Sequence, residues 1–253
     1  MAINYPTSID TFTNPTPSDN LDTPSVLHTD QHANINDAVT ALETKVGVND
    51  STDASSLDFR SFQLMPALTA PDNTQFTWVN QGSVTLDLTG PGILLTAPDQ
   101  NSDDAVHLRT KPVIGATFTL TALVHVHIYP NSYSNVGIGL RDSGSGKLVY
   151  IGLAFAAGGV GFFLIQRPSP TSANDTNIDL RAPNYYHHQV WFRITVDSTN
   201  ATYYYSFNGR DFLTVYQEAK NNYLPAITDT WFGVDNYSSG QNAYMRLLSW
   251  NEV

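Results

Sequence analysis

The chain has 253 residues, which is enough for one large β domain or two ordinary domains. Its 12 basic and 23 acidic residues give a net charge of −11, which would repel a phosphate backbone, so we expect no nucleic-acid partner. The absence of cysteine excludes disulfide scaffolds, thiol catalysis and cysteine-ligated zinc. Almost all of the acidic residues are aspartates, which favour turns over helices, so the composition disfavours a mostly helical protein.

The chain begins with a proline-containing arm. Four prolines lie in residues 6–24 among Ser, Thr, Asn and Asp, and each proline biases the residue before it away from helix. The arm is therefore predicted to be extended and without a core of its own. No basic stretch followed by an apolar one opens the sequence, so no secretory signal is expected.

A helix is predicted next, because residues 29–46 contain neither Pro nor Gly and Gly47 follows as a stop signal. One seam of this helix repeats at spacings of four and three, which is a coiled-coil rhythm. The seam consists of His28, His32, Ile35, Val39, Leu42 and Val46. We expect residues 1–47 to associate as a homotrimer through this seam. The alternative is a helix that packs on the β domain of its own chain.

Residues 48–62 are polar and are predicted to be a linker, and residues 63–253 alternate with the period of β-strands. In residues 190–197, for example, Phe192 and Ile194 face one way while Trp191 and Arg193 face the other. The strands are expected at 113–129, 136–140, 190–197, 201–207, 212–216, 231–237 and 243–250. Their turns and the lack of intervening helices predict a mainly β fold, an antiparallel β-sandwich of the jelly-roll type.

One uncharged stretch, residues 148–165, is long enough to be considered as a membrane span. It contains four glycines, and the pair Gly158-Gly159 separates two apolar runs. A β-hairpin is therefore favoured over a membrane segment, and no membrane partner is expected.

The arm and the helix carry two motifs. They are Tyr5-Pro6 with Ile9-Asp10-x-Phe12, and His28-x-x-Gln31-His32 followed by Asn36-Asp37-Ala38-Val39. Together they resemble an N-terminal module of tailed-bacteriophage structural proteins, such as head-fibre and tail-fibre components. The resemblance covers about a fifth of the chain. It implies a homotrimer on the virion surface, attached to capsid or tail proteins through Tyr5, Pro6, Ile9 and Phe12.

The C-terminal half carries a second resemblance. Its residues are Trp191-Phe-Arg-Ile-Thr-Val, Tyr205-Ser-Phe-Asn-Gly, Trp231-Phe-Gly-Val and the strand from Met245 to Trp250. This order of strands is similar to that of concanavalin-A-like (laminin-G-like) jelly rolls. That fold includes lectins, glycanases and structural modules, so the fold alone does not choose a function.

Signatures of catalysis are missing from the sequence. No two glutamates lie in one predicted strand, as a retaining glycosidase on this fold would require, and no polysaccharide-lyase strand is found. A nucleophile elbow, a P-loop and a His-Glu-x-x-His motif are also absent. We therefore expect a protein that is not an enzyme.

Two groups of residues are candidates for metal binding. His125 and His127 lie two apart in a strand, so both rings face one way, but a polar strand face is favoured because no third ligand is identifiable. Asp99, Asp103 and Asp104 are candidate ligands for Ca²⁺. No cofactor is expected, with Ca²⁺ as the alternative.

Aromatic residues outside the predicted core suggest a saccharide ligand, because Tyr and Trp combine a flat apolar face with a hydrogen-bonding group. The candidates are Trp191, Arg193, Tyr185, Tyr186, Tyr237 and Tyr244. Our leading interpretation is a non-enzymatic phage virion protein, a head or tail fibre or a capsid decoration, that binds host-surface polysaccharide. The alternative is a secreted or cell-surface carbohydrate-binding domain, either lectin-like or a glycanase.

Overall fold

The structure, a computed structural model, describes residues 7–8, 28–49, 51–64, 67–99, 105–128, 134–156, 159–173, 175–179, 189–237 and 240–253. The chain divides into two compact units, Met1–Ala67 and Leu68–Val253. We call them the N-terminal unit and the sandwich unit, and each is described by itself. The predicted arm, with Tyr5, Pro6, Ile9 and Phe12, lies outside the described residues.

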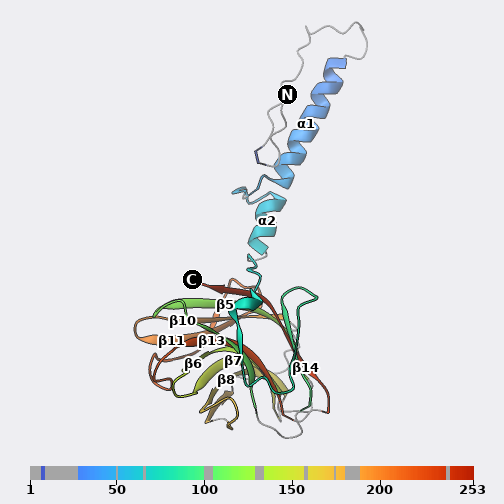
Figure 1. The fold of residues 1–253 in the computed structure, drawn as a ribbon. Coiled ribbons are helices and arrows are strands. Elements are labelled where there is room, and N and C mark those ends of the chain that lie inside the picture. The colour runs from blue at the N-terminus through green and yellow to red at the C-terminus, as the bar shows by residue number, and fades with distance from the viewer. Residues whose placement is uncertain are drawn as a thin grey trace. The chain divides into compact units, whose positions relative to one another are not determined.

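The predicted helix of the N-terminal unit is α1, His28–Val46 (Figure 1). It ends as the sequence indicates: Gly47 has a φ of +90°, and its N–H donates to the carbonyl of Glu43 over 2.7 Å. Within a single chain, the seam side chains Ile35, Val39 and Leu42 are 58%, 37% and 62% exposed. The apolar stripe of α1 is therefore solvent-accessible in the isolated protomer.

The segment predicted as a linker contains a second helix, α2, Leu57–Leu64, so the expectation of a single helix was wrong. Ser56 precedes α2 and is fully buried, and its hydroxyl accepts the N–H of Phe59 over 3.1 Å, which is an N-cap. The carboxylate of Asp58 accepts the N–H of Ser51 over 2.9 Å. The polar composition of this segment reflects capping and turn bonds of this kind.

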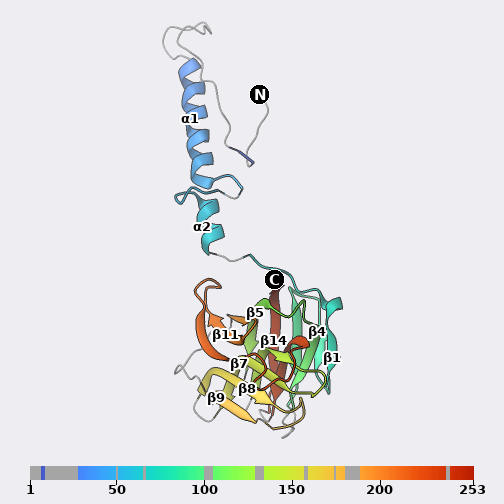
Figure 2. The same cartoon turned by 90° about the vertical axis from the view of Figure 1, so that its left-hand side faces the viewer.

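The sandwich unit consists of two antiparallel seven-stranded sheets, which can be followed in Figures 1 and 2. A short 3-10 helix, Asn73–Gln75, precedes them. Sheet A has, in spatial order, β1 (Thr77–Val79), β4 (His107–Pro112), β13 (Asp229–Asn236), β6 (Ser134–Arg141), β7 (Leu148–Ala156), β8 (Gly159–Arg167) and β9 (Thr176–Asp179). Sheet B has β12 (Leu213–Ala219), β11 (Asn200–Ser206), β10 (Gln189–Val196), β5 (Phe118–His127), β14 (Ala243–Glu252), β3 (Ile93–Ala97) and β2 (Thr85–Asp87). The predicted jelly-roll-like β-sandwich is confirmed.

The uncharged stretch from residue 148 to 165 forms the antiparallel neighbours β7 and β8, as the hairpin interpretation predicts. The ladder closes at the pair Ala156 and Gly159. Among the described residues, the helices are too short or too polar to cross a membrane.

The main core lies between the two sheets, and strand alternation determines which residues enter it. On β10, Val190, Phe192, Ile194 and Val196 are at most 1% exposed, as their period of two predicts. Burying each such side chain contributes about 1.5–3 kcal/mol relative to leaving it in water, so this core supplies most of the driving force for folding.

A second hydrophobic cluster lies on the other face of sheet A. It includes Trp231 and Tyr150, whose ring centroids are 5.0 Å apart, and both side chains are at most 1% exposed. Gly139 pairs with both residues on the strand between them, and a Cβ there would lie 2.6 Å from the Trp231 ring. Glycine therefore makes room for two aromatic rings to lie against the sheet.

Sheet A curls over this second cluster. The sheet order places two strands between β8 and β13, and three between β8 and β4. Even so, Arg167 at the end of β8 forms an ion pair of 2.8 Å with Asp235 of β13, and both side chains are 1% exposed. The N–H of Val106, beside β4, donates to the carbonyl of Pro170 over 2.8 Å. These contacts join distant corners of the sheet, so the described part of this face is filled by the protein itself.

Candidate ligand-binding site

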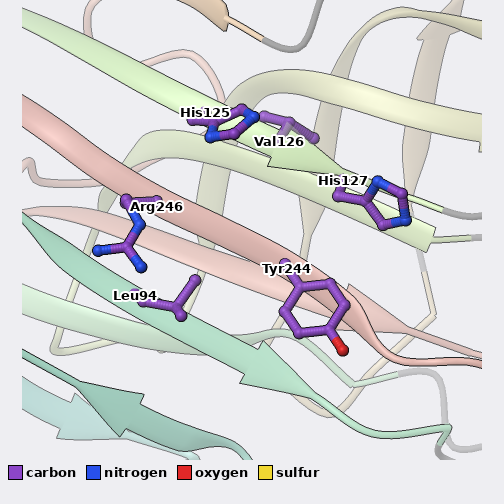
Figure 3. A pocket seen from close by; sticks show the side chains of 6 residues that line it. All are labelled: Leu94, His125, Val126, His127, Tyr244 and Arg246. Carbon is purple, nitrogen blue, oxygen red and sulfur yellow. The ribbon is translucent and has the colours of Figure 1, made fainter. Parts of the chain in front are cut away.

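The outer face of sheet B, which points away from the main core, carries a pocket of about 230 Å³ (Figure 3). We call it the outer-face pocket. It is lined by Leu94, His125, Val126, His127, Tyr244 and Arg246. These residues come from three neighbouring strands, β3, β14 and β5, so the floor of the pocket is a hydrogen-bonded sheet.

Strand register places the polar side chains of the pocket in two rows. Arg246 is paired with His125 across β14 and β5, and Tyr244 is paired with His127. The rings of His127 and Tyr244 are 5.9 Å apart between centroids and tilted by 57°. Both histidines are exposed, whereas Tyr244 and Arg246 are half-buried. The pocket thus offers one aromatic ring, two imidazoles and a guanidinium to solvent.

Arg246 is held in place by the backbone of residues 90 and 91. Its Nη1 donates to the carbonyl of Pro91 over 2.9 Å. The guanidinium also lies against Gly90, where a Cβ would be 2.6 Å from Nη1. A side chain at position 90 would therefore collide with the guanidinium.

The positive charge of Arg246 reaches Asp87 on β2. Hydrogen bonds from Thr89 lower the pKa of Asp87, and the positive charge of Arg246 adds a smaller effect in the same direction. The carboxylate of Asp87 accepts the N–H of Thr89 over 2.7 Å, so it is engaged in its own turn.

The structure corrects the predicted role of Trp191. The indole lies on the face that alternation predicts, opposite Phe192, but it is only 7% exposed. It is therefore not an accessible platform for a sugar. Its neighbour Arg193 is half-buried: the guanidinium lies 3.6 Å from the ring centroid of Phe212, its Nε donates to the hydroxyl of Thr121, and burial lowers its pKa.

The predicted tyrosines do not form one group. Tyr244 lies in the outer-face pocket, whereas Tyr237 follows the last residue of β13, which belongs to sheet A. Tyr185 and Tyr186 lie outside the described residues. Among the described candidates for saccharide binding, Tyr244 lines the outer-face pocket.

Of the predicted calcium ligands, Asp99 lies within the part of the chain that the structure describes. The carboxylate of Asp99 accepts the N–H of Gly240 over 3.0 Å, while Asp103 and Asp104 lie outside the described part of the chain. His125 and His127 share a face, as predicted, and both line the pocket. Across the residues that the structure describes, no group of three or more His, Cys, Asp or Glu side chains is positioned to hold a metal ion.

Sequence reasoning did not identify Arg246 or Leu94 as site residues. A signal was present for Arg246, because it follows Tyr244 by two positions on a strand and therefore shares its face. The pairing of β14 with β5 and β3, which joins segments far apart in the sequence, was not predicted. That pairing creates the pocket.

No protein-family model and no curated protein matches the sequence at a significant level. Among solved structures, a functionally unknown protein from Saccharomyces cerevisiae is similar with a TM-score of 0.53 and 15% identity, over 71% of this chain and 96% of that one. The GH43 BlXynB protein from Bacillus licheniformis is similar with a TM-score of 0.51 and 13% identity, over 67% of this chain and 34% of that one. This chain thus spans about a third of the GH43 protein. At these identities, the likeness shows that the sandwich unit shares their fold.

Proposed function

We propose that the sandwich unit binds a saccharide in the outer-face pocket. The observation that carries the proposal is the pair of rings formed by Tyr244 and His127 beside Arg246, on the open face of a rigid sheet. A sugar presents an apolar C–H face to an aromatic ring and hydroxyl groups to polar side chains, and the pocket offers both kinds of partner. Its volume of about 230 Å³ is below the roughly 300–1,000 Å³ of sites for drug-sized ligands, which suits one sugar unit of a longer chain.

The comparison with BlXynB supports a carbohydrate-related role, since GH43 proteins are glycoside hydrolases. The lining of the pocket favours binding over hydrolysis. Glycoside hydrolysis generally uses two carboxylates on either side of the scissile bond, whereas the residues that line this pocket include none. We therefore assign the pocket to carbohydrate recognition, which fits the lectin-like alternative of the sequence analysis better than a purely structural virion role.

We also propose that three chains associate through α1. The exposed residues Ile35, Val39 and Leu42 lie at coiled-coil spacing, and two further copies would cover them. Three linked pockets would raise the avidity for a repeating polysaccharide well above the affinity of one pocket. Attachment to a phage capsid or tail, and a place on the virion, remain predictions from the motifs of the arm.

The saccharide proposal is tested with a glycan array and the full-length chain. Tyr244→Ala should abolish binding to the glycans that the unmodified protein binds, because it removes the ring on which the sugar rests. Tyr204→Ala is the matched control, since Tyr204 is half-buried and lies on the outer face of sheet B away from the pocket lining. Equal loss in both variants, or no glycan bound by the unmodified chain, would overturn the proposal.

The trimer is tested by light scattering on the same full-length protein. We expect a particle of three 27.8 kDa chains, and Ile35→Asp should convert it to monomers because three carboxylates would meet in one layer of the seam. Thr44→Asp is the matched control, because Thr44 is exposed and its change should leave assembly intact. The neighbouring Glu43 is unsuitable as a control because it is buried. A monomer at micromolar concentration would refute the trimer.

A further inference from the structure

We infer that the outer-face pocket selects a saccharide unit that carries a carboxylate, such as a uronic or sialic acid. This inference rests on the proposed saccharide function and names its ligand class. The chain has a net charge of −11, yet the pocket lining contains a guanidinium and two imidazoles and no carboxylate. The positive charge in the pocket of an acidic protein attracts an anionic ligand locally. A neutral sugar would gain no affinity from this charge.

The guanidinium of Arg246 is prepared for a carboxylate before any ligand arrives. Its bond to Pro91 uses one of five N–H donors, and the guanidinium lies beside Gly90, where the absence of a side chain leaves room for it. The half-buried guanidinium retains donors for a ligand, and arginine pairs with carboxylates through two parallel hydrogen bonds. The bond to Pro91 restrains the guanidinium before a ligand binds, which reduces the side-chain entropy that binding costs.

The spacing of the pocket residues matches one acidic sugar unit. Tyr244 and Arg246 are two residues apart on β14, which places their Cα atoms about 7 Å from each other on the same face of the sheet. A sugar ring on Tyr244 and His127 can therefore direct a carboxylate on that ring toward Arg246 and His125. In Figure 3, Arg246 and His125 lie at one end of the pocket, and Tyr244 and His127 lie at the other.

Asp87 gives the inference an internal control. Its carboxylate interacts electrostatically with Arg246, so it competes weakly with an anionic ligand for the same positive charge. Asp87→Asn removes that competition, while the amide oxygen can still accept the N–H of Thr89. A carboxylated ligand should bind more tightly to this variant, whereas a neutral ligand should bind unchanged.

The test uses the full-length chain on an array that carries neutral, carboxylated, sulfated and phosphorylated glycans. We expect the strongest signals from carboxylated glycans. Methyl esterification of the best ligand should lower its affinity about 10- to 100-fold, as the loss of one charge-assisted pair implies. Arg246→Gln should lower the affinity for the carboxylated ligand by the same factor. Arg246→Lys should retain only part of the affinity, because lysine lacks the planar group that forms two parallel hydrogen bonds. Gly90→Ala should also weaken binding, without any change of charge, by displacing the guanidinium.

The outcomes separate this inference from the proposed function. Suppose that neutral glycans bind best, that Tyr244→Ala loses binding and that Arg246→Gln keeps it. That result would overturn the selection for a carboxylate but would support the saccharide site. Equal binding of sulfated or phosphorylated glycans would also overturn it, since that result shows a response to charge alone. An array without any signal would overturn both proposals.

Discussion

The buried ion pair between Arg167 of β8 and Asp235 of β13 allows a direct test of how burial sets the cost of losing a charge partner. Arg167 and Asp235 are 2.8 Å apart and both side chains are 1% exposed, so truncating Asp235 to Ala leaves a buried guanidinium without its carboxylate. A second pair of the same chemistry, Arg141 with Asp229, is 3.1 Å apart with both side chains 15% exposed. Asp235→Ala and Asp229→Ala therefore form a matched comparison in which burial is the main difference.

The expected costs follow from burial. Removing one partner of a buried pair costs about 3–5 kcal/mol, because the remaining charge has lost both water and its counter-ion. A pair near the surface is worth about 1 kcal/mol or less, because water solvates the charge that remains. With a urea slope of about 2 kcal/mol per molar, Asp235→Ala should lower the unfolding midpoint by about 2 M and Asp229→Ala by about 0.5 M or less.

Urea unfolding of the full-length protein can be followed by tryptophan fluorescence. All four tryptophans lie in the sandwich unit, at positions 78, 191, 231 and 250, so the signal reports on that unit. In the double variant Arg167→Met with Asp235→Ala, part of the stability should return, since no charge is left buried. Equal midpoint shifts for the two single variants would refute the reasoning, because burial would then have no influence on the cost.

Three further predictions concern the interior of the sandwich unit. Gly152→Ala should destabilise it by about 1–3 kcal/mol, measured by urea unfolding, because the new Cβ would lie 2.1 Å from the carbonyl oxygen of Val136. Trp231→Phe should cost about 1–3 kcal/mol in the same assay, since the buried indole N–H then no longer donates to Leu140 over 3.1 Å. Burial raises the pKa of Glu218 in the folded state. The protonated side chain therefore contributes fully to stability below the unfolded pKa of about 4.3, and this contribution is lost as the pH rises through the folded-state pKa. Glu218→Gln should therefore raise the melting temperature at pH 7 and have a smaller effect near pH 4; a constant difference between these pH values would contradict this.

The sequence predicted the longer strands of the sandwich and missed the shorter ones. β10 and β14 have one face in the main core, and their apolar residues recur with period two, so their positions could be predicted closely. The short strands β1, β2, β3, β4 and β9 were missed. Each has between three and six residues, which leaves little room for a period to be visible.

The candidate site was predicted less well than the fold. Alternation correctly placed Trp191 on the outward face of its strand, but it does not indicate what covers a face. Trp191 is buried, whereas Tyr244, which was chosen as an aromatic residue outside the predicted core, lines a pocket. Arg246 becomes a site residue through the pairing of β14 with β5 and through its contact with Gly90. Both are long-range contacts, which a local pattern cannot reveal.

The glycines of sheet A have a consequence for how its strands find their partners. Gly233, Gly137 and Gly152 are paired in one row across β13, β6 and β7. Sliding any one of these strands by a single residue would bring its core-facing neighbour, such as Ile138 or Ile151, to the face where Trp231 and Tyr150 need space. Misaligned pairings are therefore penalised by steric collision as well as by lost burial. The row of glycines therefore favours a single register of β13, β6 and β7.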